Sequence, residues 1–78
     1  MMTYKVIADD SGAFIYDTTT DDACTSKIHH PYGFNRQAHM NLANEIIDRA
    51  TSLYGTPSRG EWESVKEEVW EEEDLKYD

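Results

Sequence analysis

The sequence lacks several features that mark common classes of protein. Its 78 residues include a single cysteine, Cys24, which cannot form an internal disulfide, and this is typical of a protein from a reducing cytoplasm. No run approaches the ~20 apolar residues needed to cross a bilayer, and the start MMTYKVIADD has no basic region typical of a signal peptide. We therefore expect a soluble cytoplasmic protein.

Basic residues are also scarce. Seven Lys and Arg side chains stand against 16 Asp and Glu, which gives a formal net charge of −9. DNA, RNA and anionic membranes are bound through a basic footprint, so direct binding to any of them is not expected. The acidity favours a basic protein partner. The alternative is that it only keeps the protein in solution.

Motifs of catalysis are missing as well. There is no glycine-rich phosphate loop, nucleophile elbow or Ser/His/Asp ordering. Carboxylate pairs such as Glu67 and Glu68 are expected on a solvated helix, which is a poor setting for general acid–base work. A chain of this length has little room for both a core and a deep substrate cavity. We expect neither an enzyme nor a cofactor.

Residue types that bind metals occur at only four nearby positions, Cys24, His29, His30 and His39. Their spacing is C-x4-H-H-x8-H. Structural zinc sites usually hold ligands in pairs two to four residues apart, and this spacing does not supply two such pairs. The sequence therefore predicts no metal site.

The N-terminal third of the chain has the pattern of a β-hairpin. Thr3–Ala8 and Ala13–Thr18 are rich in strand formers, and Asp9–Gly12 between them has the composition of a turn. An isolated hairpin is barely stable, so it should pack on a helix or gain a third strand. Thr18–Asp22 is expected to be a polar loop, and Ser26–His30 is the candidate third strand.

The stretch from Asn35 to Gly55 predicts the central helix. Asn35 suits the N-cap, and Gly55 can adopt the left-handed conformation that ends a helix. Apolar residues recur between them at helical spacing and form one stripe. The stripe consists of Leu42, Ala43, Ile46, Ala50 and Leu53. It should pack on the hairpin, with Phe14 or Ile15 opposite.

A second helix is expected from about Pro57 to Asp74. Trp62, Val65 and Val69 form its apolar stripe, with Trp70 at the margin. We therefore predict a single α+β domain over residues 1–78. An N-terminal antiparallel hairpin of two or three strands packs on the central helix, and the acidic helix follows it.

The second helix holds most of the excess negative charge. Residues 61–78 contain nine acidic and two basic side chains, so they account for −7 of the total −9. Between Glu61 and Asp74 the acids would lie about 2.6 Å apart along a helix axis, against ~1.7 Å per charge in duplex DNA. Stacked like charges destabilise a helix, so this density favours a surface that binds a basic partner. The alternative is a solvated face or a disordered acidic tail.

The short length, the hairpin turning at DDSG, the central helix and the acidic segment EEVWEEED resemble one loose class of proteins. These are small acidic phage-encoded inhibitors of the anti-CRISPR and anti-restriction DNA-mimic type. The resemblance implies a non-enzymatic inhibitor that acts by protein–protein contact in the host cytoplasm. It is compositional, so it implies no particular residues.

The charge pattern itself indicates which residues would contact a basic nucleic-acid-binding protein. The predicted partner-binding residues are Glu63, Glu67, Glu68, Trp70, Glu71, Glu72 and Asp74. The alternative is a structural or adaptor module that self-associates as a homodimer through apolar helix faces, with Trp70 and Tyr77 as contacts.

Overall fold

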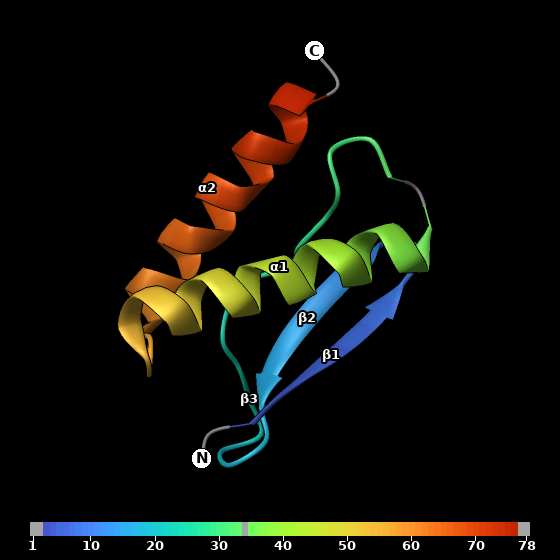
Figure 1. Ribbon diagram of the computed structural model, residues 1–78. Coiled ribbons are helices and arrows are strands. Elements are labelled where there is room, and N and C mark those ends of the chain that lie inside the picture. Colours follow the sequence, from blue (N-terminus) through green and yellow to red (C-terminus); the bar gives the residue numbers. More distant parts are fainter. Residues whose placement is uncertain (1–2, 34, 77–78) are drawn as a thin grey trace.

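The computed structural model describes residues 3–33 and 35–76 and has an α+β fold, as predicted. A three-stranded antiparallel sheet in the order β1-β2-β3 is followed by two helices, which lie on the same side of the sheet (Figure 1). The elements are β1 (Tyr4–Asp9), β2 (Gly12–Asp17), β3 (Asp22–Ala23), α1 (Arg36–Tyr54) and α2 (Arg59–Lys76).

The predicted hairpin is present, and its turn is closed by a side chain. Val6 pairs with Ile15 in the register of β1 and β2. The Asp9 carboxylate accepts hydrogen bonds from the backbone N–H groups of Ser11 at 2.7 Å and Gly12 at 3.1 Å. Gly12 has φ 153°, and a Cβ there would lie 2.7 Å from the carbonyl oxygen of Ile28. A glycine is therefore needed at this position, because the backbone of Ile28 approaches the turn closely.

The third strand does not lie where the sequence predicted it. It is β3, which begins within the expected Thr18–Asp22 loop, while Ser26–His30 contributes a single isolated bridge between Ile28 and Ala13. The two residues of that bridge exchange backbone hydrogen bonds of 2.8 Å. Between β3 and the bridge the chain bulges away from β2, so the ladder is interrupted.

Helix α1 begins and ends at the predicted residues. The Asn35 side chain accepts from the backbone N–H of Ala38 at 2.9 Å, and Gly55 ends the helix with φ 70°. Ile46 is fully buried, and Ile15 of β2 is buried in the same core. Phe14 instead points to the outer face of the sheet, where its ring lies 6.2 Å from that of Tyr16. Of the two expected partners for the helix, Ile15 is therefore the correct one.

One member of the predicted α1 stripe is not buried. Leu42, Ala43, Ile46 and Ala50 are in the core, but Leu53 is 59% exposed. Leu53 belongs to the last turn of α1, which extends beyond the strands (Figure 1). The predicted helical spacing was correct, but Leu53, the last residue of the stripe, remains mostly exposed.

Helix α2 packs on α1 through the predicted stripe. Trp62, Val65 and Val69 are buried, and the Trp62 ring meets that of Tyr4 edge-on at 5.1 Å. The helix begins at Arg59, two residues after the approximate predicted start at Pro57. A capping box sets this start, because Ser58 N–H donates to the Glu61 carboxylate at 2.8 Å and Glu61 N–H donates to Ser58 Oγ at 3.3 Å.

Candidate partner-binding surface on helix α2

Most acids of α2 are bound within the protein rather than presented to solvent alone. Glu68 and Glu72 both pair with Arg49 of α1. Arg49 Nη1 lies 3.0 Å from Glu68 Oε1, and Arg49 Nη2 lies 2.9 Å from Glu72 Oε1. The hydrogen bond from Arg49 holds the pKa of Glu72 below its ordinary value. These two predicted binding residues therefore join α2 to α1.

Glu63 fastens α2 to the bulge that follows β3. Its carboxylate accepts from the Ser26 backbone N–H at 2.7 Å and from Ser26 Oγ at 3.2 Å, and Lys66 Nζ lies 3.4 Å away. Burial by itself raises the pKa of Glu63, but the Ser26 N–H and the Lys66 ammonium outweigh burial and lower it. The sequence did not indicate this role, because Ser26 is 37 residues away.

The C-terminal end of α2 is attached to the loop before α1. His30 Nδ1 accepts from the Tyr32 backbone N–H at 3.1 Å, so Nε2 carries the proton and donates to Glu73 Oε1 at 3.0 Å. Glu73 also accepts from Lys76 at 3.0 Å. A hydrogen bond with Asp74 raises the pKa of Tyr32. Asp74, predicted as a binding residue, is thus engaged with this loop.

His39 also connects separate parts of the fold through hydrogen bonds. His39 is buried, and its Nδ1 accepts from the His30 backbone N–H at 2.9 Å while its Nε2 lies 3.2 Å from the carbonyl oxygen of Asp10. Across residues 3–33 and 35–76, no three His, Cys, Asp or Glu side chains are grouped as metal ligands would be. Cys24 is buried, and burial raises the pKa of its thiol.

Two predicted acids differ from their neighbours. Glu67 and Glu71 are exposed, and neither has a hydrogen bond or ion pair with any residue that the structure describes. They lie one turn apart on α2, on either side of Trp70 in the sequence. The charge of these two carboxylates is therefore not compensated locally.

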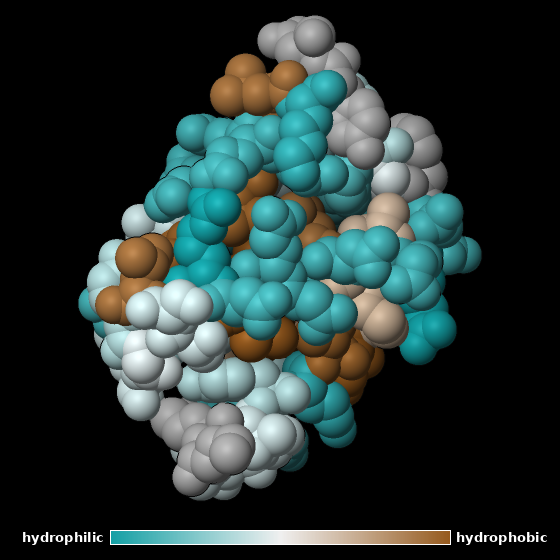
Figure 2. Space-filling view, viewed as in Figure 1, coloured by the Kyte–Doolittle hydropathy of each residue, from teal (hydrophilic) through white to brown (hydrophobic). Residues whose placement is uncertain are grey.

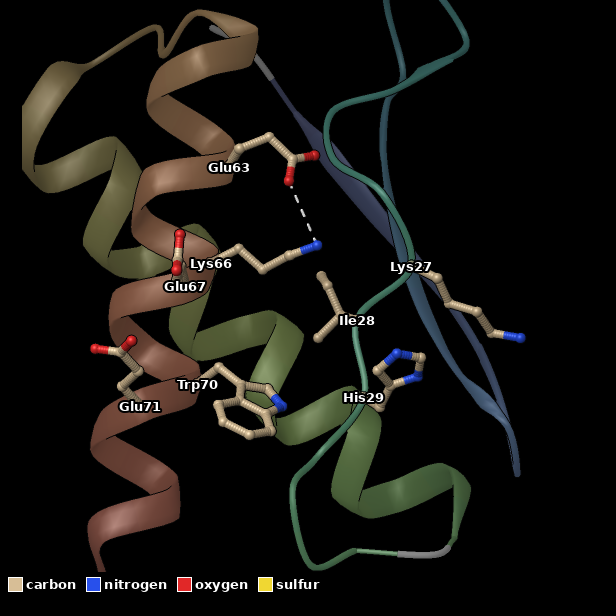
Figure 3. A pocket seen from close by; sticks show the side chains of 8 residues that line it. All are labelled: Lys27, Ile28, His29, Glu63, Lys66, Glu67, Trp70 and Glu71. Carbon is tan, nitrogen blue, oxygen red and sulfur yellow. Dashed lines mark ion pairs between the residues drawn. The ribbon is translucent and has the colours of Figure 1, made fainter.

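Both acids border a groove between α2 and the segment that carries the isolated bridge (Figure 3). We call it the α2 groove, and its volume is about 410 Å³. It is lined by Lys27, Ile28, His29, Glu63, Lys66, Glu67, Trp70 and Glu71. Figure 2 shows the face on which α1 lies foremost, and that face is largely hydrophilic, with apolar side chains showing between polar ones.

The cations of the α2 groove are already occupied. Lys66 donates to Ser26 Oγ and pairs with Glu63. Lys27 donates to Ser11 Oγ at 2.6 Å, and Figure 3 shows its chain directed away from α2. Trp70 is half-buried and packs against the core. The groove thus combines an apolar wall with two acids that form no ion pair with any described residue.

The structure therefore separates the seven predicted residues. Glu67, Trp70 and Glu71 come together at the groove, and Glu63 lines it while bound to Ser26. Glu68, Glu72 and Asp74 contact other elements of the protein. Sequence reasoning missed the opposite wall, Ile28 and His29, because only the fold brings this segment beside α2.

Comparisons of this chain with protein-family models, with curated proteins and with solved structures gave no match. Among the described residues, neither helix has an apolar stretch long enough to cross a membrane.

Proposed function

We propose that this protein is a non-enzymatic inhibitor that places its acidic α2 surface in the basic nucleic-acid-binding site of a partner protein. The observation that carries the proposal is the pair of uncompensated carboxylates, Glu67 and Glu71, beside the half-buried Trp70. The proposed mode of action is that of small phage-encoded anti-CRISPR and anti-restriction proteins, which act in the cytoplasm of the host.

Local energetics support a binding role for these two acids. Like charges four residues apart on a helix destabilise it by a few tenths of a kcal/mol. Glu68 and Glu72 have the same spacing, but Arg49 lies between them and offsets their repulsion. Glu67 and Glu71 have no such cation among the described residues. A basic partner would supply it.

The remaining acids support the same proposal at longer range. The net charge of −9 attracts a basic partner before contact and speeds association at low ionic strength. Contact itself would centre on Trp70, since tryptophan is enriched among the residues that dominate interface energies. The proposal thus assigns steering to the whole molecule and contact to the α2 groove.

Self-association through apolar helix faces is the alternative. The apolar stripe of α2 is buried inside the protein, and so is that of α1 up to Ala50. Trp70 remains available in part, and the other expected contact, Tyr77, lies outside the described residues. The large apolar side chains that the described helices expose are Leu53, Tyr54 and Leu75, which lie at the C-terminal ends of α1 and α2 rather than on one continuous face.

The test begins with a pull-down from a bacterial lysate and identification of the proteins that elute at high salt. The informative variant is Glu67→Lys with Glu71→Lys. Glu63 stays unchanged because its reversal would break the contact with Ser26. The matched control is Glu45→Lys with Asp48→Lys on α1, which changes the charge equally at acids without a described ion-pair partner.

We expect all variants to fold, as judged by circular dichroism. The α2 variant should neither bind nor inhibit the partner. The α1 variant should still bind and inhibit it, although its binding at low salt should be weaker. Nucleic acid should displace the wild-type protein from the partner. Simultaneous binding of protein and nucleic acid, or equal loss in both variants, would refute the proposal.

A further inference from the structure

We infer that the α2 groove receives an arginine side chain of the partner, with its guanidinium stacked on the Trp70 indole and paired with Glu67 and Glu71. The inference rests on the proposed function in one respect, the basic character of the partner. It adds the residue type that is recognised and the place where it binds.

The shape of the groove suits a flat group. Figure 3 shows the Trp70 ring between α2 and the chain at Ile28 and His29, with the indole nitrogen on the side toward His29. The ring packs against the core on one side and borders the open groove on the other. A planar cation can therefore lie along the ring without displacing any side chain of the core.

The charge of the groove selects a cation. The two lysines that line it already bind oxygens of Ser11, Ser26 and Glu63. Glu67 and Glu71 are the carboxylates left at its border without a cation among the described residues. A positive group over Trp70 would gain from both the ring and these acids.

Arginine fits this combination better than lysine. The guanidinium is planar, stacks on aromatic rings, is weakly hydrated and presents several N–H donors in a fork. Figure 3 shows the Glu67 and Glu71 carboxylates on the outer side of α2, away from the Trp70 ring, so each must turn toward the groove to accept from an edge of that fork. A lysine ammonium is compact and strongly hydrated, so it would keep more of its water in an open groove.

The groove also has space for the backbone around the arginine. Its volume of about 410 Å³ exceeds that of one side chain. The Trp70 indole N–H has no hydrogen-bond acceptor among the described residues. A carbonyl of the bound segment would supply this acceptor, which favours an arginine within an extended peptide.

The experiment uses hexa-arginine and hexa-lysine peptides, which carry equal charge, and follows the two tryptophan indole N–H signals by NMR. Trp70→Phe identifies the Trp70 signal. We expect hexa-arginine to shift that signal with about two- to fivefold tighter binding than hexa-lysine, while the signal of the buried Trp62 stays in place.

Two variants separate the ring from the acids. Trp70→Leu keeps an apolar side chain and all the charges, so it should bind both peptides equally, with binding followed by calorimetry. Glu67→Gln with Glu71→Gln should weaken both peptides, and Glu45→Gln with Asp48→Asn on α1 should weaken them less.

Equal affinity of the wild-type protein for the two peptides, a response at Trp62 instead of Trp70, or no binding of either peptide would overturn the arginine inference. Those results leave the proposed function standing, because charge alone could mediate it. Conversely, failure of nucleic acid to compete for the captured partner would refute the proposed function, while an arginine preference at Trp70 would still stand.

Discussion

Chemically identical side chains on α2 have different roles, and single contacts decide which. Glu63 and Glu67 are four residues apart, and both were predicted to bind the partner. Glu63 lies opposite the backbone of Ser26 and is bound to it, while Glu67 faces the solvent at the border of the α2 groove. At the scale of the residue, one acid therefore supports the fold and the other is available to a partner.

This difference predicts unequal effects on stability. Glu63→Gln should lower the free energy of unfolding by about 1 kcal/mol, because a charged acceptor of the Ser26 N–H is lost from a partly exposed site. Glu67→Gln is the control and should change it by less than about 0.5 kcal/mol. Urea unfolding measures both. Equal effects would show that the bond to Ser26 contributes nothing.

The same contact predicts a pH dependence. The folded protein lowers the pKa of Glu63 below 4.5, so its contribution to stability is complete above that pH and is lost as the pH falls through the folded pKa. Glu73, whose pKa is lowered by Lys76 and His30 against the effect of burial, adds to the loss in the same direction. Unfolding free energies of the wild type should fall below pH 4.5, and Glu63→Gln should fall less steeply.

At the scale of the element, each helix is stabilised by burial of its apolar face. That face is buried only where another element covers it. Ile46 and Leu53 both belong to the predicted stripe of α1. Ile46 meets the core of the sheet and is fully buried, but Leu53 lies on the final turn and is mostly exposed. Periodicity locates the face, and the length of the covering sheet determines how much of it is buried.

Two alanine substitutions on α1 test this point. Ile46→Ala should lower the free energy of unfolding by about 2–5 kcal/mol, because it leaves a cavity in the core. Leu53→Ala should change it by less than about 0.5 kcal/mol. Chemical unfolding followed by tryptophan fluorescence measures both. A folded Ile46→Ala protein with unchanged stability would show that the assigned face is wrong.

At the scale of the whole molecule, ion pairs with Arg49 and several hydrogen bonds attach α2 to the rest of the protein. Arg49 binds it from α1, Ser26 binds Glu63 from the bulge, and His30 binds Glu73 from the loop before α1. The acids left over are grouped at the α2 groove rather than spread evenly. Glu67 and Glu71, which have no hydrogen bond or ion pair among the described residues, thus lie on either side of the partly open Trp70 in the sequence.

The distribution of charge and apolar surface predicts a monomer. Copies with a net charge of −9 repel one another, and the central apolar stripes of both helices are buried inside the chain. Sedimentation equilibrium at micromolar concentration and low salt should give the chain mass of 9.0 kDa. A dimer under these conditions would favour the self-association alternative. A dimer only at high salt would show that repulsion, rather than burial, keeps the chains apart.

The sequence by itself determined the hairpin, both helices and most of their buried faces. These features depend on neighbouring residues: the Asn35 cap, the turn before Gly12 and the helical spacing of Trp62, Val65 and Val69. It also located the acidic segment and Trp70. Such signals are local, so they can be seen without knowing the fold.

Only the tertiary structure decided where the third strand lies, which end of the α1 stripe is exposed and which acids remain unpaired. Ser26 is 37 residues from Glu63, and Arg49 is 23 residues from Glu72. Nothing in the spacing of acids along α2 distinguishes Glu63 from Glu67, because the groups that bind or avoid them arrive from other elements. The candidate site is therefore what remains of an acidic helix after the fold has paired the rest of its acids.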